Sequence, residues 1–179
     1  MSGTLAAEDF HCAPCALSYA ELGVPEAVRI IGEMPANART ALEATPAPVL
    51  RSRPEPGIWS ALEYACHLRD VYVTSTIRLY RTRTEDRPVL EPMLNDLRAA
   101  RFHYAETIPE AVLGELESAV DGCLAEVERV RDWDRTASRL PGEVRGTRWL
   151  VRQAAHEGVH HVRDIREVSR SGPEPSRPA

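Results

Sequence analysis

The chain has 179 residues, a formal net charge of −5, 43% hydrophobic residues and 27% charged residues. These values are typical of one soluble globular domain, and an acidic balance without a basic block argues against nucleic-acid binding. No stretch approaches 18 consecutive apolar residues, so the sequence predicts neither a transmembrane helix nor a membrane partner. The N-terminus lacks the basic and apolar regions of a secretory signal, so we expect a cytoplasmic protein. All 22 basic side chains are arginine, a bias typical of high-GC bacteria.

The first part of the chain shows little periodicity. Residues 1–24 are expected to form an irregular extension that carries a Cys-x-x-Cys motif. From 25 to 44, apolar residues recur three and four positions apart, which predicts a helix that Pro35 kinks or divides. Several prolines and a glycine predict a loop over residues 46–57.

The middle of the chain contains a clear helix-start signal. Ser60 is followed three residues later by Glu63, a capping box that predicts a helix over about 61–81. The charged, proline-containing residues 82–92 indicate another loop. A short helix is expected over 93–105.

Two further helix starts are predicted in the C-terminal half. Thr107 and Glu110 form a second capping-box pattern with proline in the first turn, so a long helix should follow. Residues 132–146 contain a proline and two glycines and predict an irregular connection. Thr147 is expected to cap a last helix that continues to about Val168.

Together these segments predict four substantial helices and no convincing strand. The expected fold class is therefore all-α, a four-helix bundle. We place the bundle over residues 25–169, after the extension 1–24 and before a disordered tail over 170–179.

Three histidines form a candidate metal site. His156 and His160 are four residues apart on one helical face, so their rings can chelate one transition-metal ion. His67, in the middle of the capped helix, is the candidate third ligand, and three imidazoles would leave coordination positions open. His161 lies about a third of a turn from His160 and is expected to be a polar or packing residue. Because the unperturbed pKa of histidine is about 6.5, this site should lose its metal steeply below about pH 6.

Charged residues near these histidines are candidates for catalysis. Glu63 and Asp70 share the helical face of the third histidine and could orient a ligand or accept a proton from bound water. Arg148, Arg152 and Arg163 on the last helix could bind an acidic substrate, although a solvated face is the plainer interpretation. We take Glu63, Asp70 and Arg152 as the catalytic candidates.

The run from His156 to His160 also matches the His-Glu-x-x-His pattern of zinc peptidases. In that interpretation Glu157 is the general base and a third ligand lies downstream. Arginine occupies positions 163 and 166, where the extended motif needs glycine and histidine. A peptidase is therefore a minor alternative. We therefore expect that Glu157 does not contact the metal and that replacing it with glutamine changes thiol-dependent activity by less than about tenfold.

Cys12 and Cys15 form an isolated Cys-x-x-Cys motif. It can be half of a zinc site, a redox pair, or a tether that packs on the bundle. Cys66 and Cys123 stand alone on separate helices and supply no second pair, whereas a mixed site with His11 stays open. We favour an accessory role for the motif and keep metal binding as one option.

The segment from Pro56 to Asp70, PGIWSALEYACHLRD, resembles the second-helix signature of the DinB/YfiT-like superfamily. The signature has a tryptophan-serine helix start and a histidine about two turns later, and the pair His156 and His160 resembles the superfamily's last-helix metal motif. The resemblance covers residues 25–168. It implies an up-down-down-up bundle with a divalent metal held by His67, His156 and His160. Characterised relatives include thiol transferases and maleylpyruvate isomerases that use mycothiol or bacillithiol.

The hypothesis that combines these features is a metal-dependent thiol S-transferase or thiol-dependent isomerase. It would act on a small electrophilic substrate, with zinc or nickel as the metal, mycothiol as the thiol, and loops 82–106 and 132–146 lining its pocket. The metal would lower the pKa of the thiol and present a thiolate at neutral pH. The alternative is a non-catalytic metal-binding bundle, either stress-related or partner-binding. Whether the chain forms a homodimer is left open.

Overall fold

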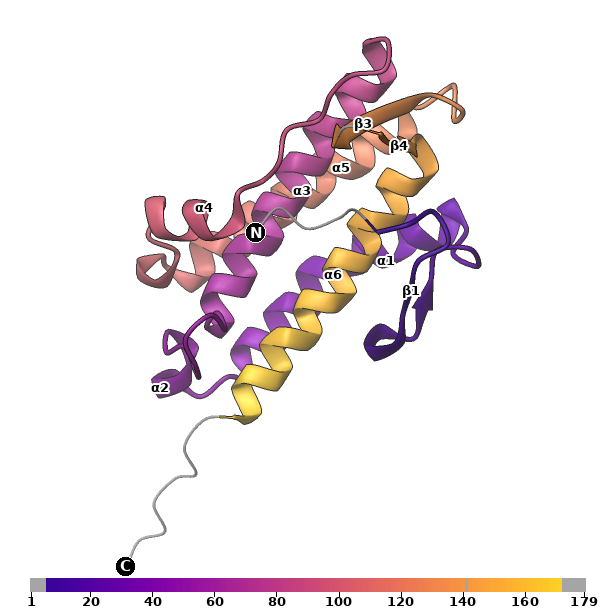
Figure 1. Cartoon of the computed structure of the whole chain (residues 1–179). Helices are drawn as coiled ribbons and strands as arrows, with labels where there is room; N and C mark the ends of the chain where they lie inside the picture. The colour runs from indigo at the N-terminus through magenta and orange to yellow at the C-terminus, as the bar shows by residue number, and fades with distance from the viewer. Residues whose placement is uncertain (1–5, 141, 172–179) are drawn as a thin grey trace, which may run out of the picture.

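A computed structural model describes residues 6–140 and 142–171, and four long helices form its frame. They are α1 (Val24–Glu43), α3 (Ala61–Thr84), α5 (Pro109–Glu128) and α6 (Thr147–Arg170). α1 and α3 each pack against both α5 and α6. α3 and α5 run in one direction and α1 and α6 in the other, which gives the expected up-down-down-up bundle (Figure 1). Among the described residues, no helix is both long and apolar enough to cross a bilayer.

The first two long helices begin and continue largely as predicted. The Glu63 backbone N–H donates to Ser60 Oγ at 3.3 Å, and the Ser60 N–H donates to Glu63 Oε2 at 2.9 Å, so the capping box is confirmed. α1 runs through Pro35 as a single helix. Proline removes one backbone hydrogen bond there. Packing of the buried face, which includes Ile31 and Met34, stabilises the helix across this position.

The second predicted capping box does not form. α5 begins at Pro109 with Ile108 as its N-cap, and no side chain caps this end. Because Pro109 takes the first helical position, Thr107 lies before the N-cap and cannot pair reciprocally with Glu110. The helix itself is present over the predicted region.

The all-α fold is confirmed, but the described residues also include two short antiparallel hairpins that were not predicted. β1 (His11–Cys12) pairs with β2 (Leu17–Ser18) around the 3-10 turn η1 (Ala13–Cys15), and β3 (Thr136–Leu140) pairs with β4 (Glu143–Gly146). Strands of two to five residues are too short to show a sustained alternation of apolar and polar positions. Both hairpins lie beside the bundle rather than within it (Figure 1).

The hairpin β3–β4 joins α5 to α6 and supports the connection that follows α3. The Ser138 N–H donates to the Pro88 carbonyl at 3.0 Å, and the Leu90 N–H donates to the Ser138 carbonyl at 2.6 Å. At the end of β4, Gly146 is the N-cap of α6 in place of the predicted Thr147. The Thr147 hydroxyl instead donates to a backbone carbonyl just before β3, at 2.9 Å.

Three shorter elements lie in the connections. α2 (Ala47–Leu50) interrupts the loop between α1 and α3. The short helix predicted over 93–105 is present as two pieces, α4 (Asn95–Arg101) and η2 (Tyr104–Glu106). The connection from α3 to α5 therefore travels back along the bundle and covers one side of it (Figure 1).

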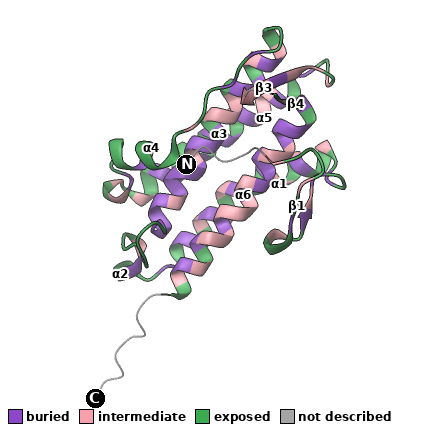
Figure 2. Cartoon of the chain, viewed as in Figure 1, coloured by how far each residue is buried: buried purple, intermediate pink, exposed green. Residues whose placement is uncertain are grey.

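The core occupies the facing sides of the four long helices (Figure 2). Its largest fully buried side chains include Trp149, Tyr19, Tyr72 and Tyr104. Tyr19 belongs to the predicted extension, so part of this segment packs into the bundle. The predicted disordered tail lies almost entirely in residues 172–179, outside the described residues.

At Gly158, helix α6 packs tightly against side chains of α1 and α3. A Cβ atom at this position would lie 2.7 Å from Met34 Sδ and would also collide with the Tyr72 hydroxyl. We expect Gly158→Ala to lower the free energy of unfolding by about 1–3 kcal/mol, although alanine is the better helix former by about 1 kcal/mol. Urea unfolding followed by circular dichroism measures the change.

Gly114 in α5 provides the matched control for this substitution. Nothing lies within 4 Å of a Cβ atom at this exposed position, so Gly114→Ala should stabilise the protein by about 1 kcal/mol. Equal unfolding midpoints for the two alanine variants would show that the close packing at Gly158 does not affect the free energy of unfolding.

Candidate metal centre and cavity

Helix α6 carries ligand-type side chains on two of its faces. Consecutive helical residues point about 100° apart. Glu157 and His161 gather with His67 of α3, whereas His156 and His160 gather with cysteines of the N-terminal extension. The structure therefore divides the three histidines predicted as one site between two clusters.

The first cluster joins α3 and α6 through His67, Glu157 and His161. Their ligand-type atoms all lie within 4.8 Å of one another. His161 Nε2 lies 3.2 Å from Glu157 Oε2, and on the other side of the ring the Nδ1–H donates to Asp164 Oδ2 at 2.8 Å. His161 thus points one nitrogen into the cluster while a carboxylate holds the other.

Aromatic side chains fix the orientation of both imidazoles. The Trp59 ring meets His67 edge to face, with centroids 5.0 Å apart. Tyr64 stacks on His161 at 5.5 Å, and the two imidazoles themselves are 4.6 Å apart. These rings leave little freedom for either histidine to turn away from the cluster.

In this first cluster, His67 is neutral, Glu157 is ionised and His161 is protonated at pH 7. Burial and the neighbouring His161 lower the pKa of His67 to about 4, so this ring is neutral at pH 7. Burial opposes ionisation of Glu157, but the hydrogen bond and positive charge of His161 outweigh it and lower the pKa of Glu157 to about 2. Burial also opposes protonation of His161, yet Asp164 and Glu157 raise its pKa to about 9.

These residues fit a divalent metal ion. His67 Nδ1 is buried and has no hydrogen-bond partner among the described residues, as expected for a nitrogen reserved for another ligand. Two imidazole nitrogens and one glutamate oxygen are also the protein ligands of known catalytic zinc sites, in which a further position stays open. The carboxylate of Asp164 behind His161 completes the usual support of such a histidine.

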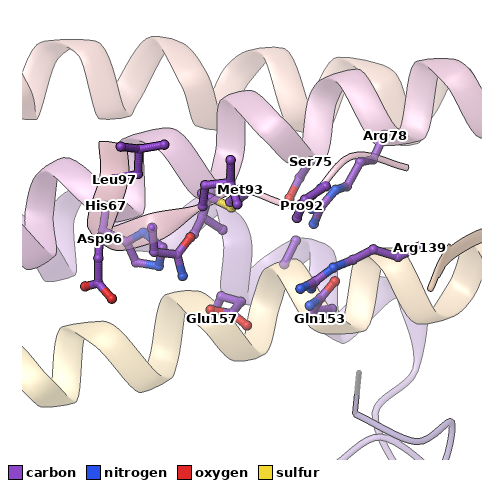
Figure 3. A pocket seen from close by; sticks show the side chains of 14 residues that line it. His67, Ser75, Arg78, Pro92, Met93, Asp96, Leu97, Arg139, Gln153 and Glu157 are labelled. Carbon is purple, nitrogen blue, oxygen red and sulfur yellow. The ribbon is translucent and has the colours of Figure 1, made fainter. Parts of the chain in front are cut away.

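A cavity of about 550 Å³ lies between α3 and α6 beside this cluster, within the size range of small-molecule sites. His67 lies at one end, Arg78 and Arg139 lie at the other, and Glu157 lies between them on α6 (Figure 3). Arg78 is about 16 Å along α3 from His67, so the cavity is elongated. Both loops predicted to line a pocket contribute to it, through residues 92–97 and through Arg139.

The two arginines give this cavity a cationic end. Arg78 is buried, and its Nη2 donates to the Glu91 carbonyl at 2.8 Å. The Nε atoms of Arg78 and Arg139 are buried without a partner among the described residues. Burial and the neighbouring Arg139 lower the pKa of Arg78 to about 10, so it stays charged at pH 7. Two adjacent guanidinium groups with unused donors are suited to bind a carboxylate or phosphate.

The second cluster joins α6 to the hairpin β1–β2. The Sγ atoms of Cys15 and Cys12 lie 3.4 and 3.8 Å from His160 Nδ1, and the ligand-type atoms of these residues and His156 all lie within 4.8 Å. Both thiols are free. Burial and the Cys12 thiol raise the pKa of Cys15 to about 12, whereas reactive redox cysteines have lowered pKa values.

This division changes the interpretation of the His-Glu-x-x-His pattern. A peptidase site needs His156 and His160 on one metal with Glu157 beside them. In the structure Glu157 belongs to the other cluster, together with His161. Glu157 is therefore a candidate ligand, in contrast to the expectation that it does not contact the metal. His161 is also a candidate metal ligand, although the sequence predicted only a polar or packing role for it.

The predicted catalytic carboxylates have structural partners away from the cavity. Glu63 belongs to the capping box and accepts a hydrogen bond from Arg53 Nη2 at 2.6 Å, which holds the loop before α3. Asp70 accepts from Arg98 Nε at 2.8 Å and from the Tyr104 hydroxyl, which anchors α4 and η2 on the bundle. Neither side chain lines the cavity.

The arginines predicted on the last helix are likewise engaged elsewhere. Arg152 Nε donates to the Leu22 carbonyl at 2.8 Å and fastens the extension to α6. Arg148 and Arg163 form ion pairs with acidic residues at 2.8 and 2.6 Å. The cationic groups that line the cavity are Arg78 of α3 and Arg139 of β3 instead. The positions of arginines along α6 could not indicate them.

The four-helix bundle, with ligand-type side chains clustered beside a cavity, defines a class of helical bundles suited to bind a metal ion. The model of the DinB superfamily matches residues 31–165, and the chain belongs to that superfamily, which confirms the resemblance seen in its sequence. Among solved structures, the chain is similar to YfiT from Bacillus subtilis, with a TM-score of 0.73 and 22% identity over 82% of this chain and 86% of that one. YfiT is described as a probable metal-dependent hydrolase with an unusual four-helix bundle topology. Comparison with curated proteins gives no match.

Proposed function

We propose that the chain is a metal-dependent enzyme that couples a low-molecular-weight thiol to a small anionic electrophile, as a thiol transferase or thiol-dependent isomerase. The observation that carries the proposal is the cluster of His67, Glu157 and His161 at a cavity whose far end holds Arg78 and Arg139. Zinc or nickel is the expected metal, because imidazole nitrogen suits both ions. When bound, such an ion lowers the pKa of a coordinated thiol or water and so supplies a nucleophile near pH 7.

The chain's own residues prepare this end of the cavity. His67 offers a neutral imidazole at pH 7, and Glu157 offers an ionised carboxylate. Asp164 accepts the Nδ1–H of His161 and thereby keeps Nε2 directed into the cluster. Because three protein ligands leave at least one coordination position open, a thiol or water can enter from the cavity.

The other end of the cavity selects the substrate. Arg78 and Arg139 have unused donors and would bind a carboxylate or phosphate group. The elongated cavity can hold two reactants end to end, or a thiol that carries a long polar tail such as mycothiol. These features support a small acidic electrophile, and a cytoplasmic location with reduced thiols belongs to the same proposal.

The test is a turnover screen on protein loaded with zinc or nickel. Transferase activity is followed as consumption of mycothiol, bacillithiol or cysteine in the presence of acidic electrophiles. Isomerase activity, which returns the thiol unchanged, is followed as thiol-dependent loss of maleylpyruvate. We expect metal-dependent turnover that His67→Ala abolishes. Metal-dependent hydrolysis without thiol would replace the proposal with a hydrolase, the activity named for YfiT. Stoichiometric metal without turnover of any kind would favour the non-catalytic bundle.

Arg78→Met removes one cationic group from the far end of the cavity while keeping a side chain of similar length. We expect kcat/KM for an acidic substrate to fall about 10–100-fold, mainly through KM, because a charge-assisted hydrogen bond contributes about 1.5–3 kcal/mol. Steady-state kinetics measure the effect. Arg148→Met is the matched control, since Arg148 is half-exposed and paired with Asp134. Equal kinetics in the two variants would exclude Arg78 from substrate binding.

A further inference from the structure

The second cluster has the composition and spacing of a closed metal site. Cys12 and Cys15 are separated by two residues, and His156 and His160 by three, as in structural zinc sites with two cysteines and two histidines. In a tetrahedral zinc site the donor atoms lie about 3.3–3.8 Å apart, given the usual bond lengths. The two Sγ atoms lie 3.4 and 3.8 Å from His160 Nδ1, already within this range.

The hairpin β1–β2 positions the two cysteines for such a site. Cys12 lies in β1 opposite Leu17 in β2, and Cys15 ends the turn between them. Ala16 adopts the left-handed conformation with φ of 49°, which lets the chain reverse sharply after Cys15. Buried Leu17 and Tyr19 fix the hairpin to the bundle, so both thiols are held against α6.

The two histidines are also oriented as ligands. His156 Nδ1 lies 3.1 Å from the Tyr19 hydroxyl, so an Nδ1–H that donates to this oxygen leaves the lone pair on Nε2. His156 Nε2 is buried and has no partner among the described residues. His160 directs Nδ1 to the thiols, while its Nε2 lies 3.8 Å from Asp164 Oδ2. Each ring therefore has one nitrogen for a metal and an oxygen near the other.

We propose that Cys12, Cys15, His156 and His160 bind a zinc ion in a closed, structural site that fastens the N-terminal extension to α6. Four protein donors complete a tetrahedron, and none of the four residues lines the cavity. The site would also hold the turn of α6 on which Glu157 and His161 lie. Because the two clusters share no residue, this inference does not depend on the proposed enzyme function.

Cobalt substitution tests the proposal on the full chain. Stripped protein is titrated with Co²⁺ under reducing conditions, and bound metal is measured together with the absorption spectrum. We expect two equivalents per chain and a thiolate-to-cobalt charge-transfer band. Cys12→Ser/Cys15→Ser should lose one equivalent and the whole band, whereas His67→Ala should lose one equivalent and keep the band. Cys123→Ala, which changes a buried cysteine on α5, should keep both.

Thiol alkylation of the protein without substitutions tests the same proposal, so the result does not depend on whether the double serine variant folds. In the unchanged protein, bound zinc should protect Cys12 and Cys15 from iodoacetamide, and chelation should expose Cys15, which is partly accessible in the fold. The proposal is overturned if the charge-transfer band is absent, if it survives in the double serine variant, or if zinc leaves the rate of alkylation unchanged. A Cys12–Cys15 disulfide in protein purified under reducing conditions would overturn it equally.

Discussion

Replacing Glu157 with glutamine is expected to lower metal-dependent turnover at least about 100-fold. Residues that merely support a ligand cost about 10–100-fold when changed, so loss of a ligand should cost no less. Glutamine keeps the size of the side chain but removes the charge that balances the metal. It also removes the carboxylate that His161 contacts at 3.2 Å. Steady-state kinetics and metal analysis of the same preparation measure both effects.

Glu167→Gln is the matched control, because Glu167 lies on the same helix and pairs with Arg163 at the surface. It should retain full activity and full metal content. If Glu157→Gln instead keeps its metal and loses less than tenfold in activity, Glu157 is not a ligand. The sequence-based prediction, a change of less than about tenfold on replacing Glu157 with glutamine, would then be correct.

The affinity of the first cluster for metal should rise with pH throughout the neutral range. His67 and Glu157 are already deprotonated, since their pKa values are about 4 and about 2, whereas His161 keeps its proton up to a pKa of about 9. Metal binding must displace that single proton. Affinity should therefore increase about tenfold per pH unit, or about a thousandfold between pH 5.5 and 8.5.

This pH dependence can be measured by chelator competition in Cys12→Ser/Cys15→Ser, which isolates the first cluster. Calorimetry in buffers of different ionisation enthalpy should show one proton released per metal. Three histidines with ordinary pKa values would behave differently, because affinity would level off above about pH 7 and several protons would be released below pH 6. A plateau between pH 7 and 8.5 would therefore count against the raised pKa of His161.

Most of the bundle could be predicted because its signals are local. The capping box at Ser60 and the helical periodicity of four segments depend on residues close in sequence, and the structure confirms them. The hairpins were missed because strands as short as β1 have no measurable periodicity. Thr107 was a misleading signal, because Pro109 sets the start of α5 later than the capping pattern implies.

The site was only partly predictable because helical spacing alone does not choose a face. The pairs 156/160 and 157/161 have the same separation in α6, so their spacing does not indicate which pair faces α3. A usable signal was present, since Glu157 and His161 continue the stripe of buried Leu150, Ala154 and Ile165 at intervals of three and four. The contribution of the cysteines could not be seen, because they lie 145 and 148 residues from His160.

Anomalous diffraction from crystals of the zinc-loaded protein, recorded on both sides of the zinc absorption edge, tests the central claim most directly. The account predicts a zinc peak bonded to His67, Glu157 and His161, with its open side toward the cavity that ends at Arg78. A peak bonded to His67, His156 and His160, or no peak beside His67 in protein saturated with zinc, would contradict it.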